Sequence, residues 1–310
     1  MHILFPSIRS FLLLLAGIIA GHLLKSPYYV IVKRWNHKCR YQMTSIPNQA
    51  RHKLLCYINT HPSNYEKKAI HVQHTWARRC DKFLFTSTIR HPALSIMLLN
   101  LTQPEIRQHL WVKMKVILRE LYRQTNEYDY FFKADDDTYA VVENLRVALE
   151  SYNPSDPFML GYRWNVLCPG GYFSGGAGYL LSRQALKQIV ELGIDKHPEC
   201  PTVDEDKEDV KMCLCGLAAG VKLYDEIGET GLSLFHPYNL NWHPGDWYRD
   251  TVPDTASSDV YLRRNALRFS TKHISFHYID STWMYTMEFV LYHLHPFRRI
   301  QATFVASSEG

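Results

Sequence analysis

Short apolar runs and longer amphipathic stretches follow one another along most of the chain. Apolar runs bounded by polar residues predict strands at 54–58, 82–86, 128–134 and 158–161. Amphipathic spacing between these runs predicts helices at 67–77, after Pro104, and at 139–152. This alternating order predicts the α/β class, with a Rossmann-like, mostly parallel sheet flanked by helices.

The N-terminal pattern is different, because residues 11–24 are almost purely apolar. That run is short for a bilayer span and also fits the core of a signal peptide. Counted from Ile3, with Arg9 at the interface, it is just long enough to span. Because no convincing cleavage site follows, we favour an uncleaved signal anchor. The expected divisions are a cytoplasmic tail (1–10), an anchor (11–24), a stem (25–50) and a lumenal catalytic domain (51–305).

Composition adds two constraints. The net charge of +5 is mild and no long run of Lys and Arg occurs, so we expect no nucleic-acid partner. Seven cysteines behind a targeting segment favour an oxidising compartment over a set of reduced core cysteines. The odd count leaves at least one thiol without an intramolecular partner, and Cys39 in the stem is the candidate.

Three adjacent carboxylates, Asp135, Asp136 and Asp137, directly follow the predicted strand 128–134. Like charges this close are costly unless a divalent cation lies among them. Mg²⁺ and Mn²⁺ prefer oxygen ligands and keep open positions for phosphate, so a nucleotide substrate is indicated. An aspartate-rich turn that caps the next helix remains an alternative. A calcium loop is excluded because Tyr139 and Ala140 stand where it needs ligands and glycine.

Three further segments complete this pattern. The turn with Gly175, Gly176 and Gly178 allows a close backbone approach. Acidic residues 204–209 open a predicted helix and include a candidate general base, although acids are common at helix starts. Histidines follow at 236 and 277, and imidazole completes many carboxylate metal sites, although a lone histidine is more often structural.

Six segments together resemble a known family. They are 71–80, 132–139, 174–179, 208–209, 235–237 and 276–281. In this order they resemble the core 1 β1,3-galactosyltransferase group of inverting β1,3-glycosyltransferases, over residues 54–296. The resemblance implies a GT-A fold, a UDP-sugar donor and Mn²⁺.

The resemblance also assigns roles. It implies that Asp135 and Asp137 form the metal-binding pair, with His277 as the third ligand. Asp136 is then expected beside the ribose or sugar of the donor. Asp209 is expected to be the catalytic base.

Other matches are looser. Arg107 and Lys113 are expected near the donor, and Tyr278 and Trp76 as pocket walls, with a core position as the alternative for Trp76. Residues 241–270 depart from the family, so Trp247 as the residue facing the acceptor is a hypothesis.

The resemblance favours two disulfides, Cys56–Cys80 and Cys200–Cys215. The family has no match for Cys168 and Cys213. These two cysteines are therefore candidates for a third disulfide that is specific to this chain.

The expected activity is transfer of galactose from UDP-galactose to the 3-hydroxyl of O-linked GalNAc on glycoproteins. A different UDP-hexose or acceptor, a catalytically silent chaperone-like paralogue and a sugar-binding module are the alternatives. The retained triplet speaks against the silent paralogue. The resemblance further implies a single-pass type II protein of the Golgi membrane and is compatible with a homodimer.

Overall fold

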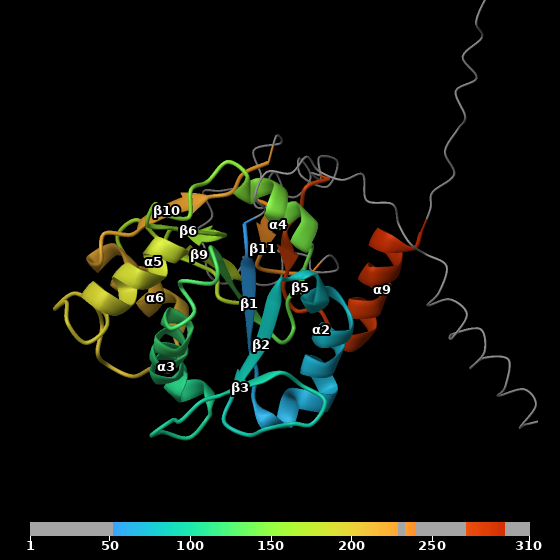
Figure 1. Cartoon of the computed structure of the whole chain (residues 1–310), viewed down its shortest axis with the longest axis horizontal. Coiled ribbons are helices and arrows are strands. Elements are labelled where there is room, and N and C mark those ends of the chain that lie inside the picture. Colours follow the sequence, from blue (N-terminus) through green and yellow to red (C-terminus); the bar gives the residue numbers. More distant parts are fainter. Residues whose placement is uncertain (1–51, 229–232, 240–270, 295–310) are drawn as a thin grey trace, which may run out of the picture. The chain divides into compact units, whose positions relative to one another are not determined.

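The computed structural model describes residues 52–228, 233–239 and 271–294. Seven strands form one sheet in the order β10-β6-β9-β4-β1-β2-β3 (Figure 1). Their bounds are β1 Leu54–Asn59, β2 Lys82–Ser87, β3 Ile96–Leu98, β4 Tyr130–Asp135, β6 Phe158–Gly161, β9 Tyr179–Ser182 and β10 Lys222–Asp225. Only β9 runs antiparallel to its neighbours in this sheet, β4 and β6. The predicted α/β class with a mostly parallel sheet is confirmed.

Helices cover both faces of this sheet, which explains why its central strands read as continuous apolar runs. One face carries α2 Ile70–His74, α4 Val142–Leu149 and α9 Ser281–Tyr292. The other face carries α3 Leu110–Tyr122, α5 Arg183–Gln188 and α6 Glu208–Ala218. Alternate residues of β1 point to opposite faces, with Cys56 in the first core and Tyr57 in the second.

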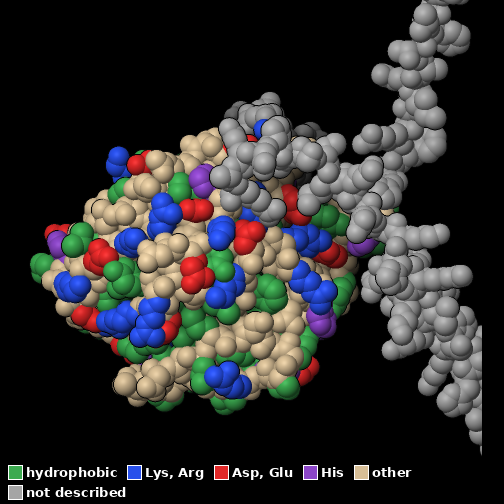
Figure 2. Space-filling model, in the orientation of Figure 1, with side chains coloured by type: hydrophobic (Ala, Val, Ile, Leu, Met, Phe, Trp, Pro, Cys, Tyr) green, Lys and Arg blue, Asp and Glu red, His purple; other side chains and the backbone are tan. Residues whose placement is uncertain are grey.

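Smaller elements surround the main sheet. A three-stranded sheet joins β11 Phe235–His236, β12 Ser275–Phe276 and β5 Tyr139–Ala140, and β7 Arg163–Trp164 pairs with β8 Tyr172–Phe173. The short helical turns are η1 Pro62–Asn64, η2 Tyr65–Ala69, η3 Trp76–Arg79, η4 Arg107–His109 and η5 Ile189–Gly193. On the face in Figure 2, basic and acidic side chains are interspersed.

Two predicted helices differ from the structure. The stretch 67–77 is divided among η2, α2 and η3 instead of forming one helix. The helix expected at 139–152 begins only at Val142, because Tyr139 and Ala140 pair with β12 as a strand. Val141 is the N-cap residue of α4 and makes no side-chain capping bond. The acidic triplet therefore does not cap this helix, and the capping alternative is wrong.

Both disulfides favoured by the resemblance are present. Cys56–Cys80 ties β1 to the end of η3, and Cys200–Cys215 ties the segment before α6 to that helix. A third bridge is not formed: the Cys168 thiol donates to the carbonyl of Gly171 (2.9 Å), and the Cys213 sulfur accepts from the amide of Phe173 (3.1 Å).

No helix in the three described stretches is long and apolar enough to cross a membrane. The expected anchor (11–24), the stem (25–50) and Cys39 lie outside those stretches.

Candidate active site

Two tight connections bring three predicted ligands together. Strand β4 ends at Asp135, whose amide is bonded to the hydroxyl of Thr138 (3.0 Å), so the chain turns back immediately. Pairing of β5 with β12 then places His277 beside this turn, with its Nε2 3.2 Å from Oδ1 of Asp137. One ligand atom from each of Asp135, Asp137 and His277 lies within 4.8 Å of the others.

The chemistry of this ligand set fits a divalent cation. The carbonyl of Pro237 lies 3.3 Å from Nδ1 of His277. Because a carbonyl only accepts, Nδ1 carries the proton and Nε2 faces the carboxylates, as is usual for metal-bound histidines. Burial raises the pKa of Asp137, but His277 and Lys68 outweigh it and hold that pKa below its ordinary value. Asp137 is therefore ionised, as a ligand must be.

The middle aspartate of the triplet turns away from the ligand set. Oδ2 of Asp136 accepts hydrogen bonds from the hydroxyl of Thr60 (2.7 Å) and the side-chain amide of Asn64 (2.9 Å). Burial raises the pKa of Asp136 to about 6 despite these two donors. Asp136 thus forms part of the wall that follows β1, separate from the two ligand carboxylates.

A buried ion pair lies behind the ligands. Nζ of Lys133 is 2.8 Å from Oδ1 of Asp135 and 3.1 Å from Oε1 of Glu208, and it donates to the carbonyl of Gly175 (2.8 Å). Burial lowers the pKa of Lys133, but the two carboxylates outweigh it and raise that pKa. Burial also raises the pKa of Glu208, to about 7.

The candidate base adjoins this pair at the start of α6. Oδ2 of Asp209 accepts from the amide of Gly175 (3.0 Å), and Oδ1 accepts from the amide of Val210 (2.9 Å). Burial raises the pKa of Asp209 above its ordinary value even with these donors. A carboxylate that is held in place and made more basic is suited to take up a proton.

The glycine turn lies between the candidate base and the predicted metal ligands. A Cβ atom on Gly175 would lie 2.8 Å from Oε1 of Glu208, and one on Gly176 would lie 1.9 Å from Cε1 of His277. At Gly176 any side chain would collide with the His277 ring, and at Gly175 it would displace the Glu208 carboxylate, because the backbone itself packs against these side chains. The close approach predicted for this turn is confirmed.

The looser matches are placed as follows. Lys113 is buried, with its Nζ 2.7 Å from Oε1 of Glu105, and it donates to the carbonyl of Thr60. The hydroxyl of the same Thr60 donates to Asp136. The Arg107 side chain is 80% exposed and pairs with Asp206 (3.5 Å).

The aromatic candidates fall into three different settings. The ring of Tyr278 stacks on His277 at 3.8 Å, with the backbone of Tyr278 in the left-handed region (φ 55°). Trp76 is fully buried and donates to the carbonyl of Thr138 (2.8 Å), so the core alternative holds for it. Trp247 lies outside the described residues.

Four contacting residues were missed by sequence reasoning: Lys68, Lys133, Thr60 and Asn64. Lys68 places Nζ 2.8 Å from Oδ2 of Asp137. A lysine inside an apolar strand was the available signal for Lys133, because such a charge needs a buried partner. Lys68, Thr60 and Asn64 had no signal of their own.

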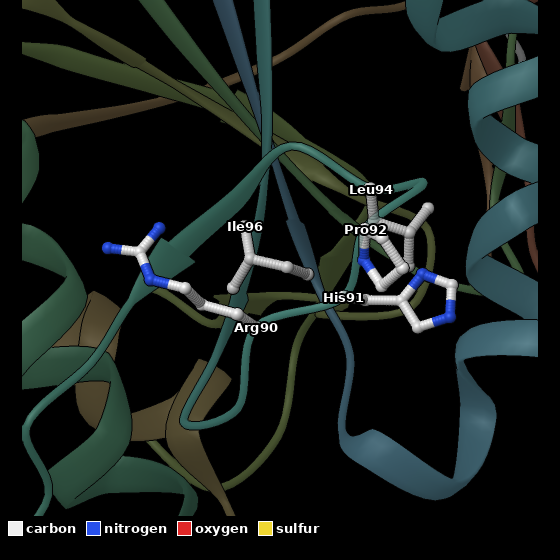
Figure 3. Close-up of a pocket in the computed structure, with 5 residues that line it drawn as sticks. All are labelled: Arg90, His91, Pro92, Leu94 and Ile96. Atoms are coloured by element: carbon white, nitrogen blue, oxygen red, sulfur yellow. The ribbon is translucent and has the colours of Figure 1, made fainter.

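A pocket of about 340 Å³ lies at the connection between β2 and β3 (Figure 3). It is lined by Arg90, His91, Pro92, Leu94 and Ile96. None of these residues belongs to the ligand set or the base, so the chemistry is assigned to the acidic cluster and not to this pocket.

Comparison with known proteins decides the family. The model of the Fringe-like family matches residues 51–224, more than half of the chain. The chain belongs to the Fringe-like family. This Fringe-like chain is 35% identical over 255 residues to glycoprotein-N-acetylgalactosamine 3-beta-galactosyltransferase 1 of Xenopus laevis, covering 78% of this chain and 67% of the relative. The resemblance to the core 1 β1,3-galactosyltransferase group is thereby confirmed.

Two more distant relatives match a shorter stretch. The beta-1,3-glucosyltransferases of Mus musculus and Homo sapiens are 27% and 25% identical over 188 residues, 59% of this chain and 35% of each relative. The Fringe-like chain therefore spans about two thirds of the first relative and about a third of these two. A solved structure of the galactosyltransferase LgtC with donor and acceptor sugar analogues superposes with a TM-score of 0.38 at 13% identity, over 72% of this chain and 86% of that chain. That likeness is too weak to support an assignment.

Proposed function

We propose that this chain is an inverting glycosyltransferase of the GT-A type. It transfers galactose from UDP-galactose to the 3-hydroxyl of O-linked GalNAc on glycoproteins. The observation that carries the proposal is the ligand set of Asp135, Asp137 and His277. The name of the Xenopus laevis relative supports the choice of sugars.

Asp135, Asp137 and His277 would hold the cation, for which we propose Mn²⁺. When bound, such a cation supplies positive charge that stabilises a departing diphosphate. The chain itself contributes the fixed ligand geometry. The amide of Thr138 is bonded to the carbonyl of Asp135 (3.1 Å), and the Thr138 hydroxyl is bonded to the carbonyl of Gly176 (2.8 Å). These bonds hold the ligand turn against the glycine turn.

Asp209 is proposed as the general base. It would take the proton from the acceptor 3-hydroxyl as that oxygen attacks the anomeric carbon of the donor. One direct displacement inverts the configuration, so an α-linked donor yields a β linkage and no enzyme side chain is modified. The bond from the Gly175 amide orients the Asp209 carboxylate for this role.

The substrate contacts are proposed from the surroundings of the ligand set. Asp136 and the exposed ring of Tyr278 adjoin the ligands and are proposed as donor contacts. Lys113 is assigned an indirect role through Thr60. Arg107 and Trp247 remain sequence-based proposals, for the donor and the acceptor respectively.

A second candidate function keeps the reaction and changes the sugars. Similarity to two beta-1,3-glucosyltransferases favours testing UDP-glucose as a donor. We also propose that residues 11–24 anchor the chain in the Golgi membrane with the described domain on the lumenal side. Support for that placement is the apolar pattern of the sequence and the two disulfides.

The test is transfer from a panel of UDP-sugars to a GalNAc-bearing peptide and to other glycan acceptors, with and without Mn²⁺. The proposal expects UDP-galactose and the GalNAc peptide to be the best pair, and the product to require the cation. A preference for another hexose would favour the second candidate. Failure with every donor would exclude both.

A further inference from the structure

Lys68 reaches the ligand set from a separate element, η2. Its Nζ lies 2.8 Å from Oδ2 of Asp137 and 3.7 Å from Oδ1 of Asp136. The other oxygen of Asp137, Oδ1, faces His277 at 3.2 Å. An ammonium group therefore contacts one oxygen of a metal-ligating carboxylate while the imidazole contacts the other.

The charge and the partial exposure of the Lys68 side chain would allow it to exchange one anionic partner for another. Like any lysine near solvent, Lys68 carries an ammonium group at neutral pH. The side chain is also 38% exposed, unlike that of Lys133, which is 1% exposed. A flexible stem with one end near solvent can redirect its charge without moving the backbone.

Two side chains of η2, the turn that carries Lys68, contact the connection between β2 and β3. The hydroxyl of Tyr65 donates to the carbonyl of Ile89 (2.6 Å), and Nε2 of His91 lies 2.9 Å from Oε1 of Glu66. In Figure 3, His91 and Arg90 point in opposite directions from the connection between β2 and β3. These two contacts tie the turn that carries Lys68 to the connection between β2 and β3.

We propose that Lys68 is a diphosphate-binding residue for a nucleoside diphosphate donor. Without ligands it neutralises Asp136 and Asp137. A dication bound to Asp137 repels an ammonium this close and competes with it for the same carboxylate. The diphosphate that accompanies the cation offers new anionic oxygens, and lysine binds phosphate as a point charge. This inference rests on the proposed function, because it takes the nucleotide-sugar site as given.

The two roles predict opposite effects of removing the charge. In Lys68→Met, Mn²⁺ alone should bind at least as tightly as to the wild type, because a competing cation is gone. UDP in saturating Mn²⁺ should bind roughly tenfold or more weakly, as expected for the loss of a hydrogen bond between charged groups. Lys67→Met is the matched control, since Lys67 is the adjacent, exposed lysine of η2. Lys68→Arg keeps the charge and should bind UDP much more tightly than Lys68→Met.

Isothermal titration calorimetry with Mn²⁺ alone and then with UDP measures both affinities on the full chain. A UDP affinity of Lys68→Met within twofold of that of Lys67→Met would overturn the proposal. The proposal would also be overturned if Lys68→Met lost Mn²⁺ affinity and UDP affinity to the same extent and had a lowered melting temperature. Lys68 would then only support the fold. If the wild type itself binds no UDP with Mn²⁺, the proposed function fails, which is a distinguishable result.

Discussion

The Nζ atom of Lys133 lies 3.1 Å from Oε1 of Glu208, and both side chains are buried. This contact joins the strand that ends in the proposed ligand Asp135 to the helix that carries the proposed base Asp209. Because the Lys133 ammonium also contacts Asp135 (2.8 Å), one buried charge connects the two halves of the candidate site.

Removal of that buried charge should destabilise the whole domain. In Lys133→Met, Glu208 keeps a buried carboxylate without its cation, which typically costs about 3–5 kcal/mol. Urea unfolding at about pH 8 measures the free energy of unfolding. The double variant with Glu208→Gln should recover part of the loss, because the unpaired charge is removed. Strictly additive losses would show that the two side chains are not coupled.

Glu208 should also make stability depend on pH. Its pKa is about 7 in the folded protein, against 4.5 ordinarily, so folding favours the protonated form. The contribution of Glu208 to the stability of the folded protein is fully present below pH 4.5 and is lost as the pH rises through about 7. Between about pH 5 and pH 8, the free energy of unfolding of the wild type should fall by on the order of 1–3 kcal/mol relative to that of Glu208→Gln, which mimics the protonated form. A difference that stays constant with pH would contradict the raised pKa.

The sequence predicted the strands of the site better than the helices around it. Leu54–Asn59 and Phe158–Gly161 are buried apolar runs, and Lys82–Ser87 is an apolar run buried in its second half, so the pattern identifies all three directly. The strand at Tyr139–Ala140 was missed because its partner, Ser275–Phe276, lies far away in the sequence. A pairing between distant segments leaves no local pattern.

Gly176→Ala should weaken cation binding, because the new Cβ would lie 1.9 Å from the His277 ring and displace it. A loss of about 10–100-fold in Mn²⁺ affinity is expected for a misplaced ligand. Gly170→Ala is the control: its Cβ meets nothing within 4 Å, and its positive φ (75°) adds only local strain. Equal Mn²⁺ affinities of the two variants in calorimetry would argue against His277 as a ligand.

Asp209→Asn should separate catalysis from binding. Loss of a general base lowers kcat by about 100-fold or more. The Mn²⁺ and UDP affinities should stay within about twofold of the wild type, because Asp209 is not a ligand in this account. Steady-state kinetics with calorimetry on the same preparation measures both. Retained turnover would exclude Asp209 as the base.

The ligand set itself could be assembled from the sequence only through the family resemblance. Asp135 and Asp137 are two residues apart in the acidic triplet, whose charge points to a cation but also fits a capping turn. His277 joins them through β5 and β12, and Lys68 through η2, so neither placement is visible in local spacing. The burial of Lys133 likewise depends on the whole sheet. It arises because helices cover both faces of the sheet, so the side chains of β4 that precede Asp135 are buried.

Galactose transfer by Asp137→Asn tests the central claim most directly. The full-length chain is assayed with UDP-galactose, a GalNAc-bearing peptide and increasing Mn²⁺, and NMR of the product identifies the linkage. We expect the wild type to form a β1,3 linkage only when Mn²⁺ is present. Asp137→Asn should lose about 100-fold or more in turnover, because a ligand that contacts both His277 and Lys68 is gone. Near-normal turnover of Asp137→Asn with an unchanged response to Mn²⁺ would contradict the account.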